Sequence, residues 1–139
     1  PTRGETFVTR KITRGLSRIK LGIDKKLFLG NINAKRDWGH AKDYVKAMWL
    51  MLQQKKPLDF VIGTGKMHSV KDFAKLAFST AGLNYKKYIK FNKKLLRPSE
   101  VETLRANYKK ASKLLRWKPT VKFEQLVKEM VLEDIKFFK

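Results

Sequence analysis

The chain has 139 residues, of which 33 are Lys or Arg and 12 are Asp or Glu, so its formal charge is +21. It contains no cysteine, which excludes a disulfide framework, a thiolate metal site and a cysteine nucleophile. A hydrophobic fraction of 42% excludes a disordered chain, and no apolar run approaches the roughly 18 residues that a membrane span requires.

The excess positive charge is compatible with a nucleic-acid binder, a binder of anionic ligands, or a compositional bias of solvated faces. Pairs of Lys begin at positions 25, 55, 86, 93 and 109, so the charge is spread along the whole chain. A dedicated nucleic-acid site usually gathers its basic residues in one patch. We therefore predict that compositional bias is the main cause, with no specific nucleic-acid partner.

The first half of the chain alternates between helical and extended patterns. Apolar residues recur at helical spacing over residues 6–21, and Gly22 follows as a stop signal. Residues 27–29 read as a short apolar strand. An irregular stretch over 36–40 then leads into a second predicted helix over 41–54.

The second half continues the alternation. A compact apolar run predicts a strand over 59–63, and Ser69 with Asp72 predicts a capping box that opens a helix ending at Gly82. The remaining chain is predicted to hold, in order, a strand over 88–91, a loop over 97–100, a short helix over 109–115 and a terminal helix with one apolar face over 123–138.

Short strands separated by helices indicate an α/β fold. The strands are too few for a complete doubly wound sheet, and no strand is followed by the turn G-x-G-x-x-G. We therefore expect that this chain does not hold a dinucleotide by itself. The chain starts at Pro1 with neither an initiating Met nor a hydrophobic signal core, so we expect a piece of a cytoplasmic protein.

Several strings of residues carry a resemblance to a known family. The segments 3–14, 35–45, 47–53 and 97–102 closely resemble stretches of GDP-mannose 4,6-dehydratases, which are extended short-chain dehydrogenases/reductases. The strings GETFVTRKI and RDWGHAKDYV are specific to these enzymes, and the match runs in register over nearly the whole chain. The resemblance implies that residues 1–139 are the C-terminal, nucleotide-sugar-binding part of such an enzyme, truncated at its N-terminus and lacking the Rossmann half.

The resemblance also implies ligand contacts. A diphosphate suits guanidinium groups, which can bond to it bidentately. The matched positions that would bind the nucleotide sugar are Val8 through its backbone, Lys11, Arg36 and Arg97 on the diphosphate, and Glu100 on the ribose hydroxyls. Arg3 matches a residue that contacts the cofactor NADP.

The complete enzyme of this family binds GDP-mannose and holds NADP mainly on the N-terminal Rossmann half, and it is expected to be a homo-oligomer. It oxidises the sugar at C4 by hydride transfer, eliminates water across C5–C6 and returns the hydride to C6, which yields GDP-4-keto-6-deoxymannose. The family's catalytic Tyr-x-x-x-Lys pair precedes the first residue here. We therefore predict no catalytic residue in this chain, and expect the fragment alone to be inactive.

The histidines and tryptophans have less specific explanations. His40 and His68 lack metal-ligand spacing, so no metal site is predicted, and His40 is expected to pack near Asp43. The three Trp residues are predicted to be core or substrate-wall residues: Trp38, Trp49 and Trp117.

Two alternative functions remain open on the sequence. One is a basic nucleic-acid-binding module, whose charge would gather on one face. The other is a fragment of a related nucleotide-sugar epimerase or reductase, which would share the fold but should lack the string RDWGHAKDYV.

Overall fold

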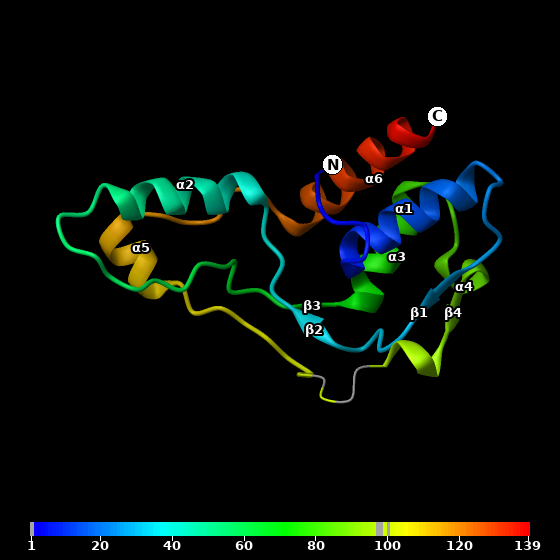
Figure 1. Cartoon of the computed structure of the whole chain (residues 1–139), viewed down its shortest axis with the longest axis horizontal. Helices are drawn as coiled ribbons and strands as arrows, with labels where there is room; N and C mark the ends of the chain where they lie inside the picture. Colours follow the sequence, from blue (N-terminus) through cyan, green and yellow to red (C-terminus); the bar gives the residue numbers. More distant parts are fainter. Residues whose placement is uncertain (1, 97–98, 100) are drawn as a thin grey trace. The chain divides into compact units, whose positions relative to one another are not determined.

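The computed structural model describes residues 2–96, 99 and 101–139, in two compact units (Figure 1). Unit 1 comprises Pro1–Ala34, Ser69–Glu102 and Val127–Lys139, and unit 2 comprises Lys35–His68 and Thr103–Leu126. Both contain helices and extended segments, so the predicted α/β character is confirmed.

Two helices of unit 1 begin and end where the sequence signals lie. Helix α1 (Val8–Lys20) stops at Gly22, whose φ of +75° is favourable for glycine. Helix α3 (Val70–Thr80) opens with the predicted capping box, in which Ser69 and Asp72 satisfy each other's backbone N–H groups.

The sheet of unit 1 is small and parallel. Strand β1 (Leu27–Leu29) pairs with β4 (Ile89–Phe91), with Leu27 opposite Ile89. Both strands were predicted. A one-turn helix α4 (Tyr85–Tyr88) precedes β4, and a 3₁₀ turn (Lys93–Leu95) follows it.

The terminal helix α6 (Phe123–Phe138) contributes to the buried part of unit 1 through Val127 and Val131, as its apolar face predicted. The same helix also buries Asp134, which the apolar pattern did not reveal. The Asp134 carboxylate lies 2.8 Å from Nε of Arg10 and accepts a hydrogen bond of 2.5 Å from the Thr13 hydroxyl. A buried charge requires such partners, because desolvation penalises an unpaired carboxylate.

Unit 2 has its own hydrophobic core. Helix α2 (Ala41–Leu52) and helix α5 (Lys109–Leu115) pack together, and Trp117 is 2% exposed beside them. The core residues are Ala47, Ala111, Leu115 and Trp117, with Tyr44, Phe60 and Ile62 packed against them. The two shortest strands are β2 (Lys35–Arg36) and β3 (His68–Ser69).

A buried carboxylate ties α2 to the segment that follows α5. Asp43 accepts hydrogen bonds from the backbone N–H groups of Thr120 and Val121 and from the Thr120 hydroxyl, at 2.9, 3.0 and 2.5 Å. Burial on its own raises the pKa of the Asp43 carboxyl, but these hydrogen bonds and the neighbouring His40 outweigh it and hold the pKa below its usual range. His40 caps α2 beside Asp43, which confirms their predicted proximity.

Three local predictions were wrong. Residues 59–63 do not form a strand, because no described strand pairs with them, although Phe60 and Ile62 still pack against the core. Arg36 belongs to β2, where an irregular stretch was expected. Trp49 is not a core residue, because it is 59% exposed.

Candidate functional site

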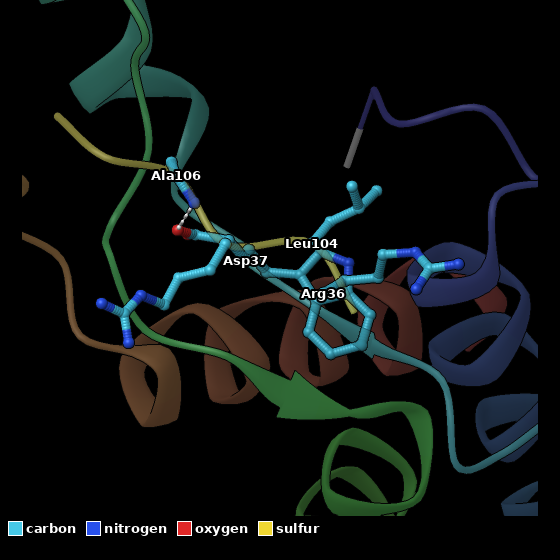
Figure 2. A pocket seen from close by; sticks show the side chains of 6 residues that line it. Arg36, Asp37, Leu104 and Ala106 are labelled. Atoms are coloured by element: carbon cyan, nitrogen blue, oxygen red, sulfur yellow. Dashed lines mark hydrogen bonds between the residues drawn. The ribbon is translucent and has the colours of Figure 1, made fainter. Parts of the chain in front are cut away.

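Unit 2 contains a cavity of about 360 Å³, drawn in Figure 2. This volume lies within the range of about 300–1,000 Å³ that is typical of ligand sites. One wall comes from the segment that begins at β2, and the other from the segment that precedes α5. The lining residues are Arg36, Asp37, Trp38, Leu104, Arg105 and Ala106.

The two walls are joined along their backbones. Lys35 forms a parallel bridge with Thr103, and the Leu104 N–H donates to the Lys35 carbonyl at 3.2 Å. Arg36 follows directly and is half-buried, with one guanidinium N–H donating to the Lys35 carbonyl at 2.8 Å. The bridge therefore fixes the backbone from which the Arg36 side chain reaches the cavity.

Asp37 links the cavity to a third segment. One carboxylate oxygen accepts from the Thr64 N–H at 2.8 Å and from the Thr64 hydroxyl at 2.6 Å. The other accepts from the Gly65 N–H at 2.8 Å and from the Ala106 N–H at 3.1 Å. Figure 2 shows the Asp37 carboxylate turned toward Ala106. All four donors satisfy the carboxylate, so Asp37 serves as a joint between segments.

Two glycines make this joint possible. Gly65 has a φ of +73°, in the left-handed region that favours glycine, and presents its N–H to Asp37. Gly63 lies so close to the opposite segment that a Cβ at this position would overlap the Ala106 side chain. The turn therefore depends on glycine at both positions.

Trp38 lines the cavity, and stacked rings support it. The Trp38 and Phe123 ring centroids lie 6.1 Å apart with planes inclined by 15°. The His68 ring lies on Phe123 at 3.7 Å, with planes inclined by 3°. Such stacked contacts hold an indole in one orientation.

The other predicted ligand residues that the structure describes lie in unit 1. Val8 and Lys11 occupy the first turn of α1 at a spacing that places them on one side of the helix, and both are half-buried. Arg3 is exposed, and its guanidinium lies 3.9 Å from the centroid of the Phe7 ring. The cavity of unit 2 therefore contains one of the five predicted substrate residues, Arg36.

Arg97 and Glu100 lie outside the residues that the structure describes. Conversely, the cavity contains Arg105, which the sequence analysis did not single out. Asp37 belongs to the string RDWGHAKDYV but received no role there. No local signal reveals its function, because its partners are 27 to 69 residues away in sequence.

The structure exposes all five Lys pairs, which begin at positions 25, 55, 86, 93 and 109. They belong to separate segments of both units, so their charge is not gathered in one segment. Among the described residues, no group of three or more His, Asp or Glu side chains could hold a metal ion. No helix in the described part of the chain is both long and apolar enough to cross a membrane.

A family model described as GDP-mannose 4,6 dehydratase matches residues 1–130 of the chain. GDP-mannose 4,6 dehydratase 1 of Arabidopsis thaliana is 56% identical over 139 residues, which is 100% of this chain and 38% of that protein. The chain thus spans about two fifths of the length of the curated relatives that it matches.

Solved structures show the same fold. RMD from Pseudomonas aeruginosa, complexed with NADPH, superposes with a TM-score of 0.89 at 19% identity, over 99% of this chain and 45% of that one. UDP-glucose 4-epimerase from Thermotoga maritima, with UDP-glucose, gives a TM-score of 0.80 at 26% identity, over 98% and 41% of the two chains. The chain therefore has the fold of one portion of the nucleotide-sugar epimerase and dehydratase structures.

Proposed function

This chain belongs to the GDP-mannose 4,6-dehydratase family, and from that premise we propose that it is the nucleotide-sugar-binding part of such an enzyme. It would hold the GDP-mannose diphosphate, while the catalytic residues and most of the NADP site lie on an N-terminal Rossmann half. The chain covers two fifths of the relatives' length, which leaves room in such an enzyme for a further part. The complete enzyme would be cytoplasmic and would form GDP-4-keto-6-deoxymannose.

The observation that carries the proposal is the position of Arg36 on the wall of the unit 2 cavity. A guanidinium group offers its N–H donors in a planar fork that matches two phosphate oxygens. Arg36 also lies within the family string RDWGHAKDYV, so position and resemblance agree. Arg105 on the same cavity adds a second positive charge to the site.

The first turn of α1 supports nucleotide binding by Val8 and Lys11. The residue before the helix makes no side-chain capping bond, and the first turn contains no acidic residue. Backbone N–H groups at a helix start, with the positive end of the helix dipole, favour anions. Arg97 and Glu100 would complete the diphosphate and ribose contacts, as the family resemblance implies.

NADP, when bound to the complete enzyme, supplies the hydride acceptor. This chain would contribute Arg3, whose exposed cationic group suits a cofactor phosphate. The remaining residues act by orienting the substrate, because remote binding contacts lower the barrier at a distant reacting centre. The isolated chain should therefore bind nucleotide without turning it over.

The test is an NMR titration of the chain with GDP and, separately, with guanosine. We expect GDP to shift resonances of the cavity residues with a Kd of about 1 mM, and guanosine to shift them much less. Arg36→Gln should weaken GDP binding about tenfold, and Arg36→Lys should recover only part of the loss. Lys113→Gln is the matched control, because it removes one exposed positive charge outside the cavity.

Equal shifts with GDP and guanosine, or equal losses in Arg36→Gln and Lys113→Gln, would contradict the diphosphate role. UDP provides a second comparison, since an epimerase-like fragment should bind UDP at least as well as GDP. An activity assay of the chain mixed with NADP and GDP-mannose should show no product.

A further inference from the structure

We propose that Asp37 is a positioning residue for the diphosphate contact of Arg36, acting through the two segments that it joins to β2. The inference rests on the proposed function, because it assigns a role within the same site. It goes beyond that function by naming a residue that holds the backbone of the binding arginine in place.

The first argument is the completeness of the Asp37 contacts. Its two oxygens receive three backbone N–H groups and one hydroxyl, from Thr64, Gly65 and Ala106, at 2.6 to 3.1 Å. These donors belong to two segments that are distant in sequence from β2 and from each other. A single side chain therefore sets the spacing between three pieces of backbone.

The second argument is the place of Arg36 between two such links. The Lys35 carbonyl accepts from the Leu104 N–H, and the Asp37 carboxylate accepts from the Ala106 N–H. The residues on either side of Arg36 are therefore both bonded to the facing wall of the cavity. With both of its neighbours held in this way, the backbone of Arg36 is fixed beside the cavity that its side chain lines.

The third argument concerns charge. A carboxylate that faced a bound diphosphate directly would repel it. Here four N–H and O–H dipoles converge on Asp37 and offset its negative charge within the wall. The same side chain can thus line an anion site and still leave the guanidinium group of Arg36 to determine what binds.

The fourth argument is chemical and explains why a carboxylate is needed. Each Asp37 oxygen accepts at least one backbone N–H, and a backbone N–H cannot become an acceptor. An asparagine amide has one oxygen and one NH₂ group. In either orientation its NH₂ would face a backbone donor, so Asp37→Asn should separate the segments that the carboxylate joins.

The experiment measures the Kd of GDP and of guanosine for the 139-residue chain and four variants. We expect Asp37→Asn to weaken GDP binding about tenfold and to leave guanosine binding within about twofold, so that the preference for the diphosphate is lost. Asp59→Asn is the matched control, since Asp59 is exposed and accepts the Lys110 hydrogen bond through its backbone carbonyl. If Asp37 acts through Arg36, Asp37→Asn should cause no further loss in an Arg36→Gln background.

Thr64 variants decide the case if Asp37→Asn does not fold. Thr64→Val deletes the hydroxyl bond to Asp37, together with the longer contacts of that hydroxyl to the exposed Lys66 backbone. It should weaken GDP binding about threefold, whereas Thr64→Ser should restore it. Equal losses for GDP and guanosine, or additive losses with Arg36→Gln, would overturn the positioning role. So would GDP binding that is unchanged in both Asp37→Asn and Thr64→Val while Arg36→Gln weakens it. If Arg36→Gln itself leaves GDP binding unchanged, the proposed function fails, and this inference fails with it.

Discussion

Two aspartates of unit 2, Asp37 and Asp43, use the same chemistry for different ends. Each joins separate segments by accepting hydrogen bonds from backbone N–H groups and from one threonine hydroxyl. The hydroxyl is that of Thr64 for Asp37, at 2.6 Å, and that of Thr120 for Asp43, at 2.5 Å. Asp43 is 4% exposed, and its partners lie in the segment that follows the core residue Trp117. The Trp117 indole N–H itself donates to the Asp43 backbone carbonyl. Asp37 is half-buried, and one of its partners, Ala106, lines the cavity.

We infer that the surroundings of each aspartate, more than its residue type, determine whether its hydrogen bonds serve stability or ligand binding. The segment bonded to Asp43 follows the core residue Trp117, so losing the joint should loosen the chain beside the core and leave part-buried donors without acceptors. One of the segments bonded to Asp37 lines the cavity at Ala106, so under the proposed function losing that joint should change binding more than stability. Four predictions separate these roles.

The largest effect is expected from Asp43→Ala. This change leaves three part-buried donors of Thr120 and Val121 without their acceptor, and it should lower the free energy of unfolding by about 3 kcal/mol. Chemical denaturation followed by circular dichroism measures the loss, with the exposed Asp59→Ala as control. The ratio of GDP to guanosine affinity in the folded protein should stay at the wild-type value; a collapsed ratio would mean that Asp43 also serves the site.

Acid should act through the same group. The pKa of folded Asp43 lies below its unfolded value, so its stabilisation is present above about pH 4. That stabilisation is lost as the pH falls through the folded pKa. Unfolding measured between pH 7 and pH 2 should show this loss, and Asp43→Ala should flatten that part of the profile. An unchanged slope in the variant would show that other carboxylates govern acid unfolding.

Gly63→Ala tests the joint at Asp37 by adding a methyl group where the backbone already approaches the facing segment closely. The new methyl group would overlap Ala106 and approach Asp37, so we expect a loss of about 2 kcal/mol together with a reduced preference for GDP. Ala106→Gly in the same chain removes the opposing methyl group and should restore much of both properties. Thermal unfolding and GDP titration of the single and double variants measure this. Failure of the second change to restore either property would argue against the close approach.

The smallest effect is expected from Asp43→Asn, and it contrasts with Asp37→Asn. At Asp43 both backbone donors bind one oxygen, and the other accepts only the Thr120 hydroxyl. That hydroxyl can reverse and accept from an asparagine NH₂ group. We expect a loss of about 1 kcal/mol in unfolding free energy and unchanged GDP preference. A loss as large as that of Asp43→Ala would show that the negative charge itself is required.

The sequence determined what depends on near neighbours along the chain. Helical spacing located α1, α2, α5 and α6 to within a few residues, and the Ser69–Asp72 capping box marked the start of α3. The strings of the dehydratase family led to the family that the comparisons show, and they are the basis for predicting Arg36 as a ligand residue. Periodicity, capping and family strings are all local in sequence, so one chain suffices to read them.

Only the tertiary structure decided which distant groups meet. The partners of Asp37 are 27 to 69 residues away and those of Asp43 are 77 and 78 residues away, so no spacing rule could pair them. The run 59–63 has a strand-like composition but finds no strand partner among the described residues. A strand and a buried carboxylate both need hydrogen-bonding partners from elsewhere in the chain, and only folding brings those partners within reach.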